Sequence, residues 1–165
     1  MKHAVRSAGT LLLMGTLMMG TGFAACAEEE VVEPAGYHVY EDTEDSVSDT
    51  WYGIARGTYL KSGTSSISKK DSTHALCSGN TMAHSKCDRV YVRIYLDQSS
   101  TGKSGSWGTI DYWTGTATNA SVATASSGSY KVTKNQYYRV TGAHSVTENG
   151  YTEATDTTTN SLKFD

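Results

Sequence analysis

The stretch DRVYVRIYLD, residues 88–97, decides the fold of this chain. Aliphatic residues occupy every second position, and aromatic or charged residues stand between them. The aliphatic positions are Val90, Val92, Ile94 and Leu96, and the positions between and after them are Tyr91, Arg93, Tyr95 and Asp97. This period of two predicts a β-strand that buries one face in a core and leaves the other face amphipathic.

The segments that follow this strand predict its partners. Residues 98–106 (QSSTGKSGS) are rich in Gly and Ser, which favour a turn region. Residues 107–116 then predict a second strand, so the two strands are expected to form an antiparallel hairpin with a long loop. Residues 136–147 (QYYRVTGAHSVT) alternate in the same way and predict a further strand.

Weaker strand patterns run through the rest of the chain and are separated by Gly, Ser, Asn and Thr. They cover residues 57–60, 65–69, 73–79, 129–133, 151–154 and 162–164. The polar run Thr155–Thr159 is expected to be a loop. Short strands spaced by roughly 8–12 residues, without a long helical period, indicate an all-β protein. We therefore expect a single small antiparallel β-sandwich over residues 51–165.

The N-terminus has the features of a secretory signal peptide. Lys2 and Arg6 precede an apolar run over residues 8–25, and Ala25-Cys26-Ala27 supplies the small residues that a signal peptidase requires. Residues 1–27 are therefore expected to be removed, which leaves a secreted chain without a membrane span. The alternative is lipidation, because Phe23-Ala24-Ala25-Cys26 is a partial lipobox in which Cys26 would anchor the chain at the cell surface.

Charge is divided unevenly along the chain that follows the signal peptide. Residues 28–50 contain nine acidic residues and no Lys or Arg, whereas residues 51–165 contain twelve basic and eight acidic residues. The first segment is expected to be a flexible, disordered acidic arm. A tether, a removable pro-segment and a strip that folds back on the basic residues are the alternatives. The positive excess after residue 51 is too small and scattered to favour nucleic-acid binding.

Two cysteines follow the signal peptide, and each belongs to an H-x-x-C unit. The units are His74–Cys77 and His84–Cys87. An oxidising exterior favours a disulfide between Cys77 and Cys87 across a turn through residues 78–86. A His₂Cys₂ zinc site and two free thiols are the alternatives. We expect no metal and no cofactor.

Patterns for catalysis are weak in this chain. There is no G-x-S-x-G elbow, and the Ser-x-x-Lys spacings at Ser66 and Ser100 are expected by chance in a serine-rich sequence. No pair of carboxylates is indicated for glycoside hydrolysis. His144 is isolated on a predicted strand and is expected to be structural. The chain is therefore predicted to have no catalytic residues and not to be an enzyme.

Aromatic side chains are the best candidates for a binding site. Trp107, Tyr112 and Trp113 lie on one predicted strand, and Tyr91 and Tyr95 lie on the amphipathic face of its neighbour. A row of exposed rings could stack on sugars or anchor a protein partner. The alternative is that these rings form the core, because the chain has few aliphatic residues.

Several blocks occur in an order that resembles a known family. They are GTYLKSGTSSISK at 57–69, CDRVYVRIYLD at 87–97, Trp107 ahead of Trp113, and YYRVTGAHSV at 137–146 followed by Glu153. The chain resembles a family of small secreted proteins of Gram-positive bacteria with unknown function, and it is more loosely similar to lactococcin-type secreted β-sandwich bacteriocins. The resemblance implies secretion and a β-sandwich, and it supplies no catalytic residues.

These observations favour a non-enzymatic binding module that acts outside the cell or at its envelope. Its partner would be a cell-wall glycan or an envelope protein, and not a nucleic acid. The alternative is a secreted, bacteriocin-like effector in which the acidic arm serves as a protective leader.

Overall fold

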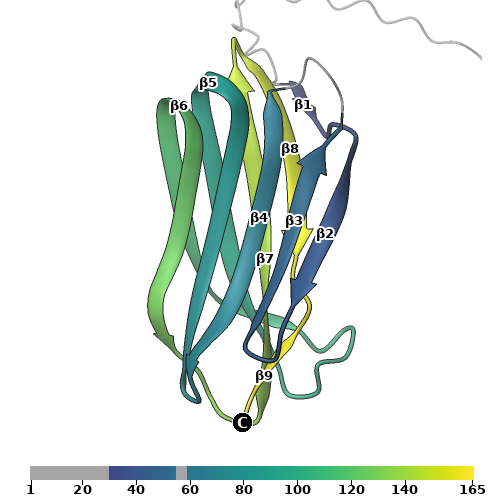
Figure 1. Ribbon diagram of the computed structural model, residues 1–165, viewed down its shortest axis with the longest axis vertical. Helices are drawn as coiled ribbons and strands as arrows, with labels where there is room; N and C mark the ends of the chain where they lie inside the picture. The colour runs from purple at the N-terminus through teal and green to yellow at the C-terminus, as the bar shows by residue number, and fades with distance from the viewer. Residues whose placement is uncertain (1–29, 55–58) are drawn as a thin grey trace, which may run out of the picture.

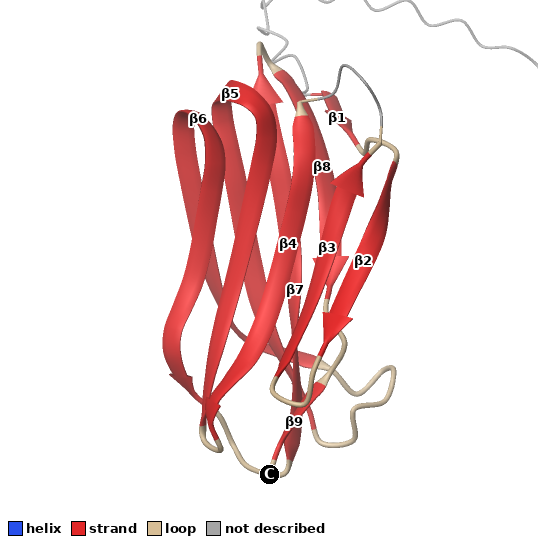
Figure 2. Ribbon diagram, in the orientation of Figure 1, coloured by secondary structure: helices blue, strands red, loops and turns tan. Residues whose placement is uncertain are grey.

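The computed structural model describes residues 30–54 and 59–165, and every regular element in these residues is a β-strand (Figures 1 and 2). The strands are β1 (Glu30–Val32), β2 (Gly36–Asp42), β3 (Ser46–Gly53), β4 (Leu60–Asp71), β5 (His74–Ser99), β6 (Gly108–Lys131), β7 (Gln136–Glu148), β8 (Tyr151–Thr158) and β9 (Leu162–Phe164). Within these ranges no helix is long and apolar enough to cross a membrane. The predicted signal peptide and part of the predicted strand 57–60 lie outside the described residues.

The two longest strands form a ribbon that folds over on itself. β5 has 26 residues and β6 has 24, and they pair antiparallel from Gln98↔Gly108 at one end to His74↔Lys131 at the other. The pairing is interrupted between Met82 and Cys87, where the ribbon turns over at the upper end of the molecule (Figure 1). Asn119, which has a left-handed φ of 48°, lies at the corresponding place in β6.

This fold-over produces two facing layers from one sheet. The first half of β5 pairs with β4, which continues through β3 to β2. The second half of β5 pairs with β7, which continues through β8 to β1, and β9 adds to the other end of β7. The layers pack closely where Gly79 meets Ile94 and Val92, because a Cβ atom at residue 79 would overlap their side chains. The backbone needs glycine there for that close approach.

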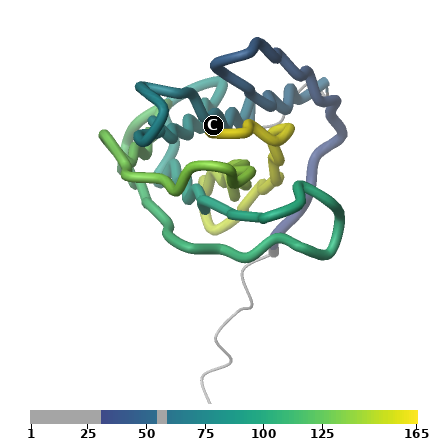
Figure 3. Tube along the Cα trace, turned by 90° about the horizontal axis from the view of Figure 1, so that it is seen from below, coloured from purple at the N-terminus to yellow at the C-terminus, as the bar shows by residue number. Residues whose placement is uncertain are grey.

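The all-β prediction is confirmed, but the prediction of a sandwich of two separate sheets is wrong. Hydrogen bonding runs continuously through the β5–β6 ribbon, so the strands belong to one strongly curled sheet that forms a half-barrel around the core (Figure 3). The sheet is also mixed, since β1 runs parallel to β8. The physical reason is the length of the ribbon, which bends without breaking its hydrogen-bonded ladder and thereby joins what would otherwise be two sheets.

The core follows the alternation that the sequence predicts. Val90, Val92, Ile94 and Leu96 are all fully buried, as are Ile67 and Val140. At the lower end Tyr138 packs edge-on against Phe164, with ring centroids 5.4 Å apart. Most of the core is therefore aliphatic, with a few aromatic rings closing its ends.

The prediction of a flexible acidic arm is wrong for residues 36–50. These residues form β2 and most of β3, and the predicted domain boundary at residue 51 falls inside β3. Val47, Asp49 and Trp51 alternate inward along β3, so the segment carries a strand pattern that its charge obscures. The Trp51 ring packs beneath Gly36, where a side chain would overlap it.

Asp49 shows how a buried acid is accommodated in this hairpin. Its carboxylate is fully buried and lies 2.9 Å from Nδ1 of His38. It also accepts a hydrogen bond of 2.7 Å from the backbone N–H of Thr158 on β8. A buried carboxylate that is paired and hydrogen-bonded in this way has replacements for its lost hydration. The acidic segment is therefore tied to both layers of the fold.

Candidate functional site

The outer face of the second layer carries a cluster of exposed and half-buried aromatic and basic side chains. We call Arg89, Tyr91, Arg93, Tyr95 and Tyr112 the Tyr/Arg face. Four of them alternate along β5 opposite the buried aliphatic row, so they point to solvent. Tyr112 joins them because it stands directly across from Tyr95 in the β5–β6 pairing.

The rings and guanidinium groups of this face contact one another. The Tyr95 and Tyr112 rings lie 6.2 Å apart and are tilted by 43°. The guanidinium of Arg93 lies 5.3 Å from the centre of the Tyr112 ring and 5.8 Å from that of Tyr91, and Arg89 lies 4.9 Å from Tyr91. Cation–π contacts of this kind hold long side chains in place at a surface. Tyr112 still exposes 57% of its surface.

A shallow trough runs beside the Tyr/Arg face, over β7 and β8. It consists of two adjoining depressions of about 280 Å³ and 300 Å³ that share Ala143 and Asp156. Tyr95 borders the first depression, and Tyr91 and Arg89 border the second. The trough forms because β7 places small side chains next to large ones on β5, as in the pair Arg93↔Ala143.

A buried histidine lies beneath the floor of the trough. His144 is 1% exposed and is surrounded by hydroxyl groups, with Thr81 Oγ1 2.8 Å from Nδ1 and Thr157 Oγ1 2.9 Å from Nε2. Thr81 donates its proton to the carbonyl of Tyr91 at 2.8 Å, so it accepts from Nδ1–H of the ring. Nε2 is then the acceptor, and Thr157 donates to it while Ser65 donates to Thr157 at 2.6 Å.

This network assigns a neutral, structural role to His144. Burial lowers the pKa of the imidazole to about 4. The interpretation of His144 as a structural residue agrees with its position, since Ser65, Thr81 and Thr157 are also buried and the ring lies between the layers.

The structure separates the five aromatic residues that the sequence grouped as a platform. Tyr91, Tyr95 and Tyr112 are brought together on the Tyr/Arg face, but Trp113 points the other way, packing edge-on against Tyr130 at 5.3 Å and against the core. Adjacent residues of a strand point to opposite faces, so Tyr112 and Trp113 cannot share one.

Trp107 belongs to neither group. It precedes β6 and lies beneath the guanidinium of Arg139, which is 4.6 Å from its ring centre. Arg139 is in turn held by Asp97 at 3.1 Å. Trp107 and Arg139 line a separate hollow with Tyr40 and Asn160.

Sequence reasoning missed the β7 and β8 side of the trough. The run Thr155–Thr159 was expected to be a loop, but most of it continues β8, with Thr155 and Thr157 buried and Asp156 exposed in the trough. The signal that could have found it is the high strand preference of threonine combined with alternation around Asp156. Low complexity concealed that pattern.

Cys77 and Cys87 are separate buried thiols in the structure, so the predicted disulfide is not formed. The prediction placed a turn over residues 78–86, whereas residues 74–83 extend as strand and only the following residues bend. Cys77 therefore lies six residues, or roughly 20 Å of strand, from Ala83 at the bend. The Cα atoms of a disulfide lie at most about 7 Å apart.

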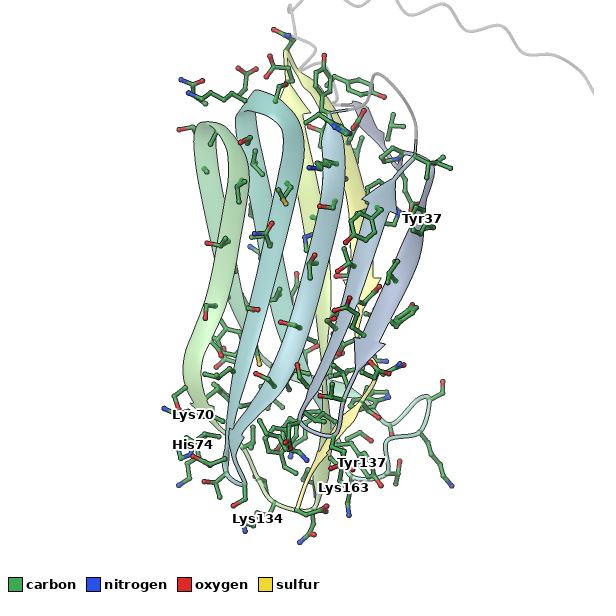
Figure 4. All side chains as sticks on the ribbon, in the orientation of Figure 1. Tyr37, Lys70, His74, Lys134, Tyr137 and Lys163 are labelled. Carbon is green, nitrogen blue, oxygen red and sulfur yellow. The ribbon has the colours of Figure 1, made fainter. Side chains whose placement is uncertain are left out.

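A zinc site formed by the two H-x-x-C units is ruled out by the same separation along the strand. His74 lies at the lower end of the molecule, as do Lys70 and Lys134 (Figure 4), and it is hydrogen-bonded to Asp71 at 3.0 Å. His84 lies at the bend, where its backbone N–H donates a hydrogen bond to the backbone carbonyl of Tyr59. In the part of the chain that the structure describes, no group of three or more His, Cys, Asp or Glu residues could hold a metal ion.

We expect Cys77 and Cys87 to be recovered as thiols from the purified protein. Burial raises the pKa of Cys77 to about 11, so it should react slowly with iodoacetamide in the folded protein. Alkylation in denaturant without reductant, followed by peptide mapping, should modify both residues completely. A peptide in which Cys77 is joined to Cys87 would contradict the observed strand geometry.

Comparison with known proteins places the chain in a family but does not supply a function. No curated protein matches the chain. No solved structure matches it either. A family model does match, over residues 25–162, which includes all of β1 to β8. On that match the chain belongs to DUF6147, a family of unknown function.

Proposed function

We propose that this protein is secreted and acts, without catalysis, as a binding module outside the cell or at its envelope, taking a glycan strand on the Tyr/Arg face. The observation that carries the proposal is the pairing of exposed Tyr112 with Tyr95, with the Arg93 guanidinium over the Tyr112 ring, beside a trough floored by small side chains. Exposed rings that are fixed in place present binding surface at little cost in conformational entropy.

The chemistry of the face suits a sugar chain. Tyrosine rings offer flat apolar surfaces for the C–H faces of pyranose rings, and their hydroxyls remain available for hydrogen bonds. Thr141, Ser145 and Asp156 add hydroxyl and carboxylate groups along the trough. Small-molecule sites are usually enclosed, with volumes of roughly 300–1,000 Å³. A shallow open trough is better suited to a polymer that lies along it.

The same face supports a role in binding over one in hydrolysis. Glycoside hydrolysis by the common mechanisms uses two carboxyl groups about 5–9.5 Å apart. Asp156 is the one carboxylate among the described residues that line the two depressions. His144 lies below the floor with its ring nitrogens engaged by hydroxyls, so it is not placed to act as a base on a bound ligand.

The position of the acidic segment argues against a removable leader, and with it against the bacteriocin-like effector. β3 contributes Trp51 to the core, and β2 covers it through Gly36. Cleavage after residue 50 would take away β2 and most of β3 and uncover this ring. An anchor is compatible with the fold, but acylation of Cys26 would leave only residues 27–29 between the lipid and β1.

The proposal is tested by binding to insoluble bacterial peptidoglycan and to soluble muro-oligosaccharides. The chain should sediment with peptidoglycan, and the oligosaccharides should shift the NMR signals of the Tyr/Arg face. Tyr112→Ala and Tyr95→Ala should each weaken binding at least about tenfold, as expected for a central aromatic anchor.

Tyr37→Ala is the matched control. Tyr37 exposes 52% of its surface, nearly as much as Tyr112, and stacks on Tyr52 at 5.7 Å on the β2–β3 hairpin (Figure 4). The Tyr37→Ala variant should bind both glycans as the unmodified chain does. Equal losses in Tyr37→Ala and Tyr112→Ala would remove the Tyr/Arg face as the site, and no binding to either glycan would favour an envelope protein as partner.

A further inference from the structure

The sheet has one long edge that carries neither charge nor proline along most of its length. Among the described strands, β6 pairs with β5 alone, so the outer edge of its 24 residues is open (Figure 1). Residues 112–130 contain no charged residue and no proline. Natural proteins usually guard such edges with charges, proline or short strands, because unpaired N–H and C=O groups recruit another strand.

The opposite edge of the sheet shows the protection that β6 lacks. β2 has only seven residues, and its end carries Glu41 and Asp42, with Glu44 and Asp45 directly after it. β1, the other border strand, has only three residues. The contrast indicates that the open edge of β6 is a specific feature and not a general property of this sheet.

The geometry of β6 makes this edge complementary to itself. Its two halves run in opposite directions side by side, since Gly115 of the first half approaches the backbone of Thr124 in the second. Trp113 and Tyr130 bridge the halves lower down, with ring centroids 5.3 Å apart. Rotation by 180° about an axis parallel to the strands would therefore set each half beside the other half of a second copy, antiparallel in both places.

We propose that two copies of this chain form a twofold dimer by pairing their β6 edges, which joins the two half-barrels through continuous ladders. The register follows from matching exposed residues at the same height. Thr116 then lies opposite Thr124 of the second copy, and Thr118 lies opposite its Val122. Threonine pairs are favourable across antiparallel strands. Val122, now 38% exposed, becomes covered.

The proposed dimer leaves the Tyr/Arg face open. Near Tyr112 the second copy presents the β6 bulge with Gly128 and Ser129, whose side chains are absent or small and do not cover the ring. The two Tyr/Arg faces then lie on opposite sides of the dimer, because the rotation exchanges the two layers. The dimer does not depend on the proposed glycan binding.

A charge-swap pair of variants of the secreted chain tests this register. Thr116 and Thr124 are both exposed, on opposite outer faces, so substitutions at both should leave the fold intact. T116K/T124K sets lysine opposite lysine twice across the twofold axis, whereas T116K/T124E sets lysine opposite glutamate twice. Sedimentation velocity should show a dimer for the unmodified chain and for T116K/T124E. The dimer dissociation constant of T116K/T124K should rise about tenfold or more.

Circular dichroism and thermal unfolding establish that both variants are folded. A monomeric unmodified chain at all concentrations would overturn the proposal, and so would equal dissociation constants for the two double variants. Larger, open-ended assemblies that both variants abolish would also overturn the closed dimer, because they would mean that β6 pairs with a different edge.

Discussion

Glu153→Ala is expected to lower the free energy of unfolding by about 2–5 kcal/mol, one of the largest losses for any single substitution of a polar residue in this protein. Glu153 is 3% exposed on β8, and one carboxylate oxygen accepts hydrogen bonds from the backbone N–H groups of Tyr59 at 2.8 Å and Leu60 at 2.6 Å. Leu60 is fully buried and begins β4, so the carboxylate ties the two layers together.

The size of the effect comes from the groups that would be left behind. Alanine removes the acceptor from two N–H groups, and each such group left buried without a partner costs about 1–3 kcal/mol. Glu153→Gln keeps a carbonyl oxygen at the same place but loses the negative charge that strengthens the bonds. It should therefore destabilise less than Glu153→Ala. Urea unfolding should show a lower midpoint with little change in the m-value.

Glu148→Ala is the matched control for this substitution. Glu148 also accepts a backbone hydrogen bond, from the N–H of Asp88 at 2.8 Å, but this bond lies at the surface. Water can replace the lost acceptor there, so the loss should be below about 1 kcal/mol. Similar midpoints for Glu148→Ala and Glu153→Ala would show that the buried carboxylate does not hold the layers together.

The second large effect is a loss of stability in acid that depends on His144. Burial lowers the pKa of this imidazole from 6.5 to about 4, with the partners of both ring nitrogens supplied by hydroxyls. Between these two pH values the unfolded chain binds a proton that the folded chain does not. The contribution to stability is therefore fully present above pH 6.5, falls as the pH drops toward 4, and changes little below that.

The difference between the pKa values of the unfolded and folded chains lowers the free energy of unfolding by about 3 kcal/mol between pH 7 and pH 4. His144→Gln removes the titrating group and keeps a side chain that can donate and accept hydrogen bonds. Its unfolding free energy should be lower than that of the unmodified chain at pH 7, with the gap narrowing toward pH 4. Urea unfolding of both chains at several pH values gives this difference, in which the contributions of the carboxylates cancel. A gap that stays constant over this range would contradict the assignment of a neutral, buried His144.

Much of the strand layout could be predicted from local pattern. The predicted strand 136–147 corresponds to β7 at Gln136–Glu148, and the predicted strand 162–164 coincides with β9. The antiparallel pairing on either side of the Gly/Ser loop is also confirmed, in β5 and β6. These predictions succeed because alternation and turn composition are local properties that a strand and its loop need wherever they lie.

The errors arose where a local signal was overruled by contacts made far along the chain. Charge predicted disorder for residues 28–50, but Asp49 is satisfied by Thr158, more than a hundred residues away. Residues 78–86 looked like a turn between two cysteines, but their first half is strand because β4 and β6 pair with it on both sides. In both cases the partners that decide the structure are invisible in the local pattern.

One part of the candidate site could be predicted from local pattern, and the other part depends on contacts between distant strands. Tyr91, Arg93 and Tyr95 could be placed on one exposed face from the sequence, because they alternate with buried aliphatic residues. The trough could not, because Ala143 and Asp156 become its floor only when β7 and β8 lie next to β5 in a specific register.

By itself the sequence determined that the chain is all-β and which side chains of each strand share a face. That information resides in the period of two, which depends on nothing beyond the strand itself. Only the tertiary structure decided that β5 and β6 fold over as one ribbon, that the sheet curls into a half-barrel instead of separating into a sandwich, and which strands flank the Tyr/Arg face. Strand neighbours and register are set by packing and hydrogen bonds between residues distant in sequence, so they emerge only when the whole sheet assembles.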